Sequence, residues 1–474
     1  MQFPLQDLNS LTPIFGLLIT AFVVVIIEAL IRKSSTLSYW ISIIGIVVSI
    51  IMTIDIFQDS TISFFEMFRL SAYGNYFSVL FMVSALFTIF LSRDYLDKLG
   101  THYGEYYAII LFATVGMILM ANAADLIIIF LGIELMSICL YILAGFMRKR
   151  LKSNEAALKY FLLSAFMTGF LLYGIALIYG TTNTTNIAKI IEYYSTNSSL
   201  PTMFWIGVGL VLIGLAFKVA SVPFHMWVPD VYEGAPTTIT AFMSTGAKAA
   251  AFSALILIFP DNLLADSKIQ LILAILASAS MIVGNIIAIS QNNIKRMLAY
   301  SSIAHAGYML IGLASANPGG KNGILFYLSA YVLMNIGAFG ILSIFEKDEE
   351  KYLTFDDYIG LSTKFPFHSA LMAIFMFSLT GIPPFAGFFG KYYIFAAAVN
   401  ANLTWLAVLG VLMSVVSAYY YLRLVVLMYF REAETTISTA FNPINNSIIF
   451  LSALGLFVFG IFPSLLMQII ERLF

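Results

Sequence analysis

About fourteen apolar segments run through this chain, each long enough to cross the hydrocarbon core of a bilayer, about 30 Å, as a helix. Apolar residues make up 61% of the 474 residues, charged residues only 10%, and the mean hydropathy is +0.93. These values are far from those of a soluble domain, so the sequence predicts an all-α polytopic membrane protein. The expected spans are 12–31, 37–55, 73–92, 104–121, 125–146, 157–179, 202–224, 236–259, 269–290, 297–315, 323–345, 366–398, 404–430 and 447–470.

Basic residues are concentrated in links on one side of these spans, and the opposite links are poor in basic residues. By the positive-inside rule the basic side is cytoplasmic, which places both termini outside. No positive region precedes the first span, so we expect a retained helix rather than a cleaved signal. The two longest links, near 180–201 and 347–364, are expected to be loops or surface helices, too short for a catalytic domain. The basic links contain Arg32/Lys33, Arg93/Lys98, Arg148/Lys149/Arg150/Lys152, Lys295/Arg296 and Lys347/Lys351/Lys364.

Several ionisable residues lie inside the apolar spans, where each charge costs about 2.5–3.5 kcal/mol on insertion scales. They must therefore face one another, water or a cavity. The net charge of −1 indicates neither a nucleic-acid nor an acidic partner, and the single cysteine, Cys139, suits no disulfide or metal site. The intramembrane residues are Glu134, Lys159, Lys218, Lys248, His305 and Lys391.

Glu134 lies well inside its span, with Ser137 one turn and Tyr141 two turns further along the same face. A glutamate at this depth is typical of a proton or ion site. The alternative is a structural carboxylate tied to a neighbouring hydroxyl. Lys159 is only one turn inside its span and follows a basic cluster, so it either belongs to a site or snorkels to the surface.

Lys218 occurs in "GLAFKVASVPFHMWVPDVYEGAPT", where His225 follows seven residues later and is expected on nearly the same helix face. Pro223 lies between them and cannot donate to the helix hydrogen bonds, so a break is expected there. Broken helices at membrane depth occur beside protein or water. Snorkelling of Lys218 is the alternative.

Two polar stripes accompany the remaining cations. Thr237, Thr240, Ser244 and Lys248 recur at steps of three and four residues along one span. Within "NNIKRMLAYSSIAHAGY", His305 has polar neighbours one turn away on both sides. Hydroxyl stripes often serve helix packing, but a lysine and a histidine within them favour a water-accessible path.

"LTGIPPFAGFFGKYYIF" (Leu379–Phe395) carries two prolines before Lys391, so a second break is expected at Gly381–Pro384. Five spans separate the two breaks, and an odd number reverses direction. This predicts two inverted five-helix units, 104–260 and 269–431, preceded by a three-helix segment, 1–103, and followed by a C-terminal helix, 447–474. Each unit would provide half a channel.

The segments around Lys218, His305 and Lys391 together resemble the antiporter-like membrane subunits of respiratory complex I, most closely the NADH-quinone oxidoreductase subunit N type. The likeness covers nearly the whole chain. In that family a fifth-helix glutamate pairs with a seventh-helix lysine, and lysines on helices six, eight and twelve continue the relay. The matching residues here are Glu134, Lys218, Lys159, Lys248 and Lys391.

The resemblance implies a proton-translocating subunit in a bacterial cell (inner) membrane, with both termini periplasmic. The proton relay would use Glu134, Lys218, Lys248, His305 and Lys391, with His225 and Lys159 beside them. No nucleotide loop, haem ligand pair or iron–sulfur cysteine set occurs in the sequence. FMN, iron–sulfur clusters and quinone are therefore expected on partner subunits, which comprise other membrane subunits of complex I and an NADH-oxidising peripheral arm.

Two alternatives stay open at this point. Subunits of multi-subunit sodium/proton antiporters share the expected fold. A membrane scaffold, in which the charges only fix helix packing, is the second alternative, and the aligned polar stripes argue against it.

Overall fold

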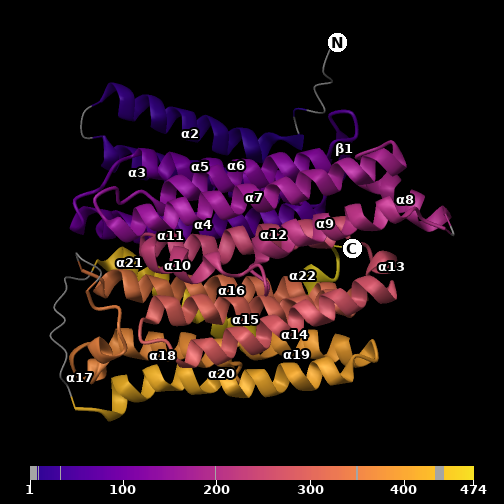
Figure 1. Cartoon of the computed structure of the whole chain (residues 1–474). Helices are drawn as coiled ribbons and strands as arrows, with labels where there is room; N and C mark the ends of the chain where they lie inside the picture. Colours follow the sequence, from indigo (N-terminus) through magenta and orange to yellow (C-terminus); the bar gives the residue numbers. More distant parts are fainter. Residues whose placement is uncertain are drawn as a thin grey trace.

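The structure is a computed structural model that describes residues 8, 10–31, 34–197, 199–347, 351–432 and 442–473. Long helices run roughly side by side, with the N-terminal half of the chain on one flank and α20 at the other (Figure 1). Twelve helices in the described ranges have the length and hydropathy of a membrane span. Helix α5 and helix α18 of the broken pair α18–α19 are shorter apolar helices. Twelve long spans with these shorter helices agree with an all-α polytopic membrane protein of about fourteen spans.

The described residues of the first half form nine helices, α2 to α10, and a small hairpin, in which β1 pairs antiparallel with β2. The elements are α2 (Thr12–Leu30), α3 (Ser35–Asp55), β1 (Thr61–Ser63), β2 (Phe68–Leu70), α4 (Ala72–Lys98), α5 (Glu105–Ala121), α6 (Leu126–Ala144), α7 (Leu151–Thr182), α8 (Ile187–Thr196), α9 (Thr202–Val219) and α10 (Trp227–Gly234).

The rest of the chain continues in the same way, and short helices in the link before α18 agree with the expectation for that link. The elements are α11 (Thr237–Phe242), η1 (Met243–Ala247), α12 (Lys248–Ile258), α13 (Asp261–Leu264), α14 (Ser267–Ile289), α15 (Ile294–Ala314), α16 (Pro318–Phe345), η3 (Asp356–Tyr358), α17 (Leu361–Lys364), α18 (Pro366–Thr380), α19 (Ala386–Asn400), α20 (Thr404–Phe430), α21 (Pro443–Ile461) and α22 (Pro463–Ile470).

The first broken helix lies between α9 and α10, as the position of Pro223 predicts. Helix α9 ends at Val219, and Ala220 adopts a left-handed conformation with φ +66°. The helix therefore ends before it reaches His225. The prediction that His225 returns to the face of Lys218 is wrong, because a helical repeat does not continue through a break.

The second broken helix lies between α18 and α19. Helix α18 ends at Thr380, Gly381 is left-handed with φ +91°, and α19 begins at Ala386. The predicted interruption at Gly381–Pro384 is thus confirmed and extends by one residue, to Phe385. Pro383 and Pro384 carry no amide hydrogen for a helical hydrogen bond.

The helix that carries Lys248 contains an irregularity that its sequence did not indicate. Residues Met243–Ala247 form a π-helical turn, η1, between α11 and α12. A π turn adds one residue to the winding, so it rotates the following residues around the helix axis. Lys248 is the first residue after this turn.

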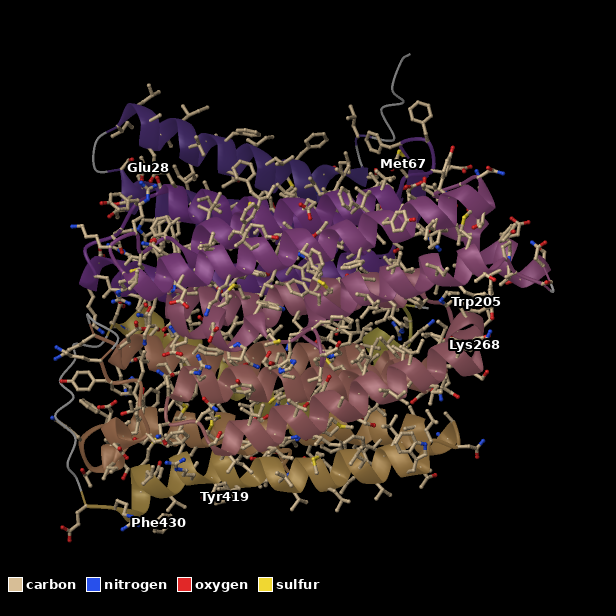
Figure 2. The ribbon with its side chains drawn as sticks, in the orientation of Figure 1. Glu28, Met67, Trp205, Lys268, Tyr419 and Phe430 are labelled. Carbon is tan, nitrogen blue, oxygen red and sulfur yellow. The ribbon has the colours of Figure 1, made fainter. Side chains whose placement is uncertain are left out.

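The basic links meet at one end of the bundle. Lys98 donates to the carbonyl of Ile344 at 2.9 Å, and Arg150 pairs with Glu346 at 3.2 Å. Figure 2 places Glu28 and Phe430 at this end and Met67, Trp205 and Lys268 at the opposite one. The expected basic residues Arg32 and Lys33 lie outside the described residues.

Candidate functional site

Four of the predicted site residues are buried in the bundle interior. The exposed fractions are 6% for Lys218, 2% for Lys248, 1% for His305 and 4% for Lys391. None of these side chains snorkels to the surface. Each must therefore be stabilised by partners inside the protein, because an unpaired polar group in this environment is costly.

Lys218 lies near the end of α9, where three helices of the first half converge. Its Nζ donates to the hydroxyls of Ser137 on α6 and Ser164 on α7, both at 2.7 Å. Pro223 follows in the break, so the lysine sits just before an irregular backbone segment. Its two acceptors are hydroxyls, which can accept and donate.

Glu134 lies on α6, one turn before Ser137, and is partly buried. Its Oε1 atom is buried and has no hydrogen-bond partner among the described residues. Between Glu134 and Lys218, the described residues show no direct salt bridge; the Lys218 ammonium is hydrogen-bonded to Ser137 and Ser164. The pair that the family resemblance implied stays a prediction. The alternative was a structural role for Glu134 with a hydrogen bond from the neighbouring Ser137 hydroxyl. This bond is absent between the two described side chains, since the Ser137 hydroxyl donates to the carbonyl of Ile133 at 2.5 Å.

Lys248 projects toward α15. Its Nζ donates to the carbonyl of Ser302 at 2.5 Å and to the hydroxyl of the same residue. The ammonium lies 5.6 Å from the ring centroid of Tyr331 on α16, within the range of cation–π attraction. The π-helical turn directly before Lys248 sets this direction.

His305 follows Ser302 by three residues on α15, so both lie on one helix face. Its Nδ1 is hydrogen-bonded to the hydroxyl of Tyr327 on α16, and its Nε2 to that of Tyr421 on α20 at 2.9 Å. Tyr421 also bonds Ser301. In neutral imidazole one nitrogen donates and the other accepts, so this histidine joins two hydroxyls into one chain of hydrogen bonds.

Lys391 lies on α19 and reaches back to the end of α18. Its Nζ donates to the carbonyls of Leu379 and Thr380, at 3.1 and 2.8 Å, and to the Ser414 hydroxyl at 2.7 Å. An ammonium has three donors, and all three are used. The break leaves these carbonyls without helical partners, so it creates the acceptor site for the lysine.

Helix α15 connects these groups. The ammonium of Lys391 lies 4.8 Å from the ring centroid of Tyr308, which is three residues beyond His305. Along α15, Ser302 therefore faces Lys248. His305 faces the hydroxyls of Tyr327 and Tyr421, and Tyr308 faces Lys391. Among the described residues, the side-chain hydrogen bonds of Lys218 go to Ser137 and Ser164, which are not part of this set.

The two remaining predicted residues lie elsewhere. Lys159 is partly exposed and pairs with Glu155 and Asp230, both at 2.7 Å, in an ion-pair cluster that joins α7 and α10. This cluster continues through Arg296 of α15, 2.8 Å from Asp230. His225 lies in the first break, where its buried Nδ1 has no hydrogen-bond partner among the described residues.

Sequence reasoning missed the hydrogen-bond partners of the buried site residues. Only the packing of four helices brings Ser164, Ser302 and Ser414 to the lysines and Tyr327 and Tyr421 to His305. A weak signal was present for Ser414, which lies on a polar stripe with Ser417 and Tyr421 at helical spacing.

The fold and the buried lysines define an antiporter-like membrane subunit. A family model described as NADH:quinone oxidoreductase/Mrp antiporter, TM matches residues 123–417. NADH-quinone oxidoreductase subunit N of Trichlorobacter lovleyi is 47% identical, over 99% of this chain and 97% of that protein. The chain therefore belongs to the NADH-quinone oxidoreductase subunit N family.

Solved structures agree with this assignment. A chain of respiratory complex I from Thermus thermophilus is 33% identical, with a TM-score of 0.84 over 96% of this chain and 98% of that one. A chain of the Mrp complex from Dietzia sp. reaches a TM-score of 0.86 at 19% identity, over 98% and 96% of the two chains. The second likeness shows the fold alone.

Proposed function

We propose that this chain is a proton-translocating membrane subunit of a respiratory NADH:quinone oxidoreductase. One observation supports the proposal beyond family membership. Lys248, His305 and Lys391 are all buried. His305 lies on α15, Lys248 binds Ser302 of the same helix, and the Lys391 ammonium lies over the ring of Tyr308. Buried ionisable groups inside a membrane are costly and typically mark ion pathways.

The proposed relay starts at Lys218 and Glu134. Burial of an ammonium favours its neutral form, and a nearby carboxylate opposes this effect. A change in the distance between Glu134 and Lys218 would therefore alter how readily Lys218 releases a proton. The proton would pass through water to Lys248, then along Ser302, His305 and Tyr308 to Lys391. His225 and Lys159 would assist at the first break and at the basic end.

Energy for translocation must come from partners. Moving one charge against the membrane potential costs about 2.3 kcal/mol per 100 mV. Relatives are named NADH-quinone oxidoreductase subunit N, so we assign the driving redox chemistry to an NADH-oxidising peripheral arm. FMN, iron–sulfur clusters and quinone would be bound by partner subunits, and other membrane subunits of complex I would flank this chain.

The proposed organisation keeps the four segments 1–103, 104–260, 269–431 and 447–474, with 104–260 and 269–431 as inverted repeats. Close packing of the first two helices in each unit supports it. A Cβ on Gly116 would lie 2.7 Å from the amide nitrogen of Met136, and a Cβ on Gly284 would lie 2.7 Å from that of Ala304. The α5–α6 and α14–α15 pairs thus both need glycine at the crossing.

The proposed location is a bacterial inner membrane with both termini periplasmic. The gathering of the basic links at one end supports this orientation, since positively charged links stay on the cytoplasmic side.

A sodium/proton antiporter subunit is the second candidate, favoured only by the fold likeness to the Mrp chain. Purification of the native complex separates the candidates. Co-purifying NADH-oxidising subunits support the first, and their absence with other antiporter subunits present supports the second.

The relay itself is tested by substituting Lys248 in the assembled complex. Arginine holds the charge but cannot release a proton at accessible pH. Both Lys248→Arg and Lys248→Ala should therefore lose most NADH-driven proton pumping, measured in inverted membrane vesicles. Full pumping by the arginine variant would exclude a proton-exchanging role and favour the scaffold alternative.

A paired test addresses the carboxylate. Glu134→Gln should lower pumping without loss of assembly, because the amide preserves the shape and removes the charge. Glu28→Gln is the matched control, since Glu28 lies at the end of the bundle (Figure 2) and accepts hydrogen bonds from Ser34 and Ser38.

A further inference from the structure

A buried carboxylate at the basic end takes no part in the relay described above. Glu346 follows directly after α16 and its exposed fraction is 0%. It accepts hydrogen bonds from Tyr95 of α4 at 3.1 Å, from Arg150 before α7 at 3.2 Å, and from the hydroxyl of Thr237 at the start of α11. Three parts of the fold thus meet at one carboxylate.

The partner of Glu346 nearest to the surface is Arg150. Its side-chain exposure is 17%, whereas that of Glu346 is 0%, so Arg150 reaches from the carboxylate toward the basic surface. Lys98 lies nearby and donates to the carbonyl of Ile344, while Tyr95 and Tyr358 are the titratable phenols facing the same carboxylate. A buried ion pair of this kind is expensive to form, and stability alone is weak justification for it.

Beyond Glu346 begins the polar stripe that ends at Lys248. Thr237, which donates to Glu346, is followed on the same helix by Thr240 and Ser244, all buried. Thr240 donates to the carbonyls of Tyr232 and Pro236, at 3.0 and 3.3 Å, and Ser244 donates to that of Ala241 at 2.8 Å. The oxygens remain able to accept from water. From Thr237 to Lys248 the rise is about 16 Å.

We infer that Glu346 is the proton-uptake carboxylate that supplies Lys248 from the basic end of the bundle, a role that rests on the proposed function. A hydronium ion at the basic surface protonates one Glu346 oxygen when Arg150 moves aside, and water is left. The neutral acid then passes its proton through water along Thr237, Thr240 and Ser244. Neutral Lys248 takes up a proton and becomes an ammonium, and the Glu346 carboxylate is restored.

A purely structural role makes different predictions. If Glu346 only clamps α4, α11 and α16 together, an amide that preserves the shape should keep pumping wherever the complex assembles. If Glu346 carries protons, Glu346→Gln should assemble and still lose pumping, because an amide cannot take up a proton at accessible pH.

The experiment uses the assembled complex in inverted vesicles and compares Glu346→Gln, Thr237→Val and Thr245→Val. Thr245 is a matched control because it is equally buried on the same helix, but its hydroxyl bonds Ser84 of α4 at 2.7 Å. Three quantities are measured: NADH oxidation with an artificial acceptor, protons pumped per NADH, and the solvent deuterium isotope effect on the coupled rate.

We expect Glu346→Gln and Thr237→Val to oxidise NADH normally with the artificial acceptor. Both should lose most of the proton pumping and show a larger solvent isotope effect on the coupled rate. Thr245→Val should match the wild type in all three quantities. If Glu346→Gln fails to assemble, Thr237→Val decides, because it leaves the pair with Arg150 in place. Wild-type pumping in both test variants, with loss in Lys248→Ala, overturns the uptake role and leaves the proposed function standing. Wild-type pumping in Lys248→Ala as well would overturn the proposed function.

Discussion

Lys218 and Lys391 carry the same charge in the two halves of the bundle, but different chemical groups accept the hydrogen bonds of the two ammonium groups. Lys218 donates to two side-chain hydroxyls, Ser137 and Ser164, and lies before its break. Lys391 lies after its break and donates to two main-chain carbonyls and the Ser414 hydroxyl. One lysine therefore depends on side chains, and the other depends on the break itself.

This difference has a chemical consequence. A hydroxyl can turn from acceptor to donor, so the surroundings of Lys218 can stabilise both an ammonium and a neutral amine. A carbonyl only accepts, so the surroundings of Lys391 suit the ammonium and adapt less well when the proton leaves. In the relay, the first site is built for exchange, and the second holds its lysine in a fixed position at the end of α18.

The largest difference in stability is expected when each lysine is replaced by alanine. Lys391→Ala removes the donor to Leu379 and leaves a buried carbonyl unsatisfied, at a cost of about 1–3 kcal/mol. Lys218→Ala leaves less behind, since Ser137 already donates to Ile133. Thermal inactivation of the purified complex should therefore shift more for Lys391→Ala. Equal shifts would show that the two sites are energetically alike.

Next in size is the effect of a methyl group on Gly381. A non-glycine residue in the left-handed conformation costs about 1–2 kcal/mol. The added Cβ would also lie 3.0 Å from Cδ of Lys391 and move that side chain away from its acceptors. We expect Gly381→Ala to lower both the thermal midpoint and proton pumping. A variant that loses stability but pumps normally would separate the backbone conformation from the position of Lys391.

Prediction from sequence succeeded for features that depend on local sequence alone, such as the length of an apolar segment or a proline within a helix. The spans follow from apolar length, and both breaks follow from prolines, which remove a helical hydrogen bond in a helix interior. It failed where the answer depends on packing or on helix phase. His225 was placed by counting through a break, and the π turn before Lys248 has no clear sequence signal.

The partners of the lysines were equally beyond the sequence. The family resemblance named Glu134 as the partner of Lys218 but gave no sign of Ser164, which accepts a hydrogen bond from the ammonium together with Ser137. Lys159 was left between a site and a surface position, and it pairs with Asp230 in a partly exposed cluster. Serine is common in membrane helices, so nothing in its sequence position separates Ser164 from serines that only assist packing.

A smaller effect is expected from the serines. Ser164→Ala removes one of two hydroxyl acceptors from Lys218, and loss of one hydrogen bond typically changes stability by about 1 kcal/mol. Ser414→Ala leaves Lys391 with two carbonyls. Proton pumping should therefore fall further in Ser164→Ala than in Ser414→Ala when both are compared at equal amounts of assembled complex. The reverse order would contradict the distinction between an exchange site and a fixed site.

The smallest effect concerns Ala220, the left-handed residue that ends α9 as Gly381 ends α18. Glycine there relieves the conformational cost but loses more freedom on folding, about 0.5–1 kcal/mol relative to alanine. These contributions oppose each other, so Ala220→Gly should change the thermal midpoint little. Pumping should also be unchanged, because the acceptors of Lys218 lie on α6 and α7 and not in the break. A clear loss of pumping in Ala220→Gly would show that the first break also holds its lysine, and the two halves would then work in the same way.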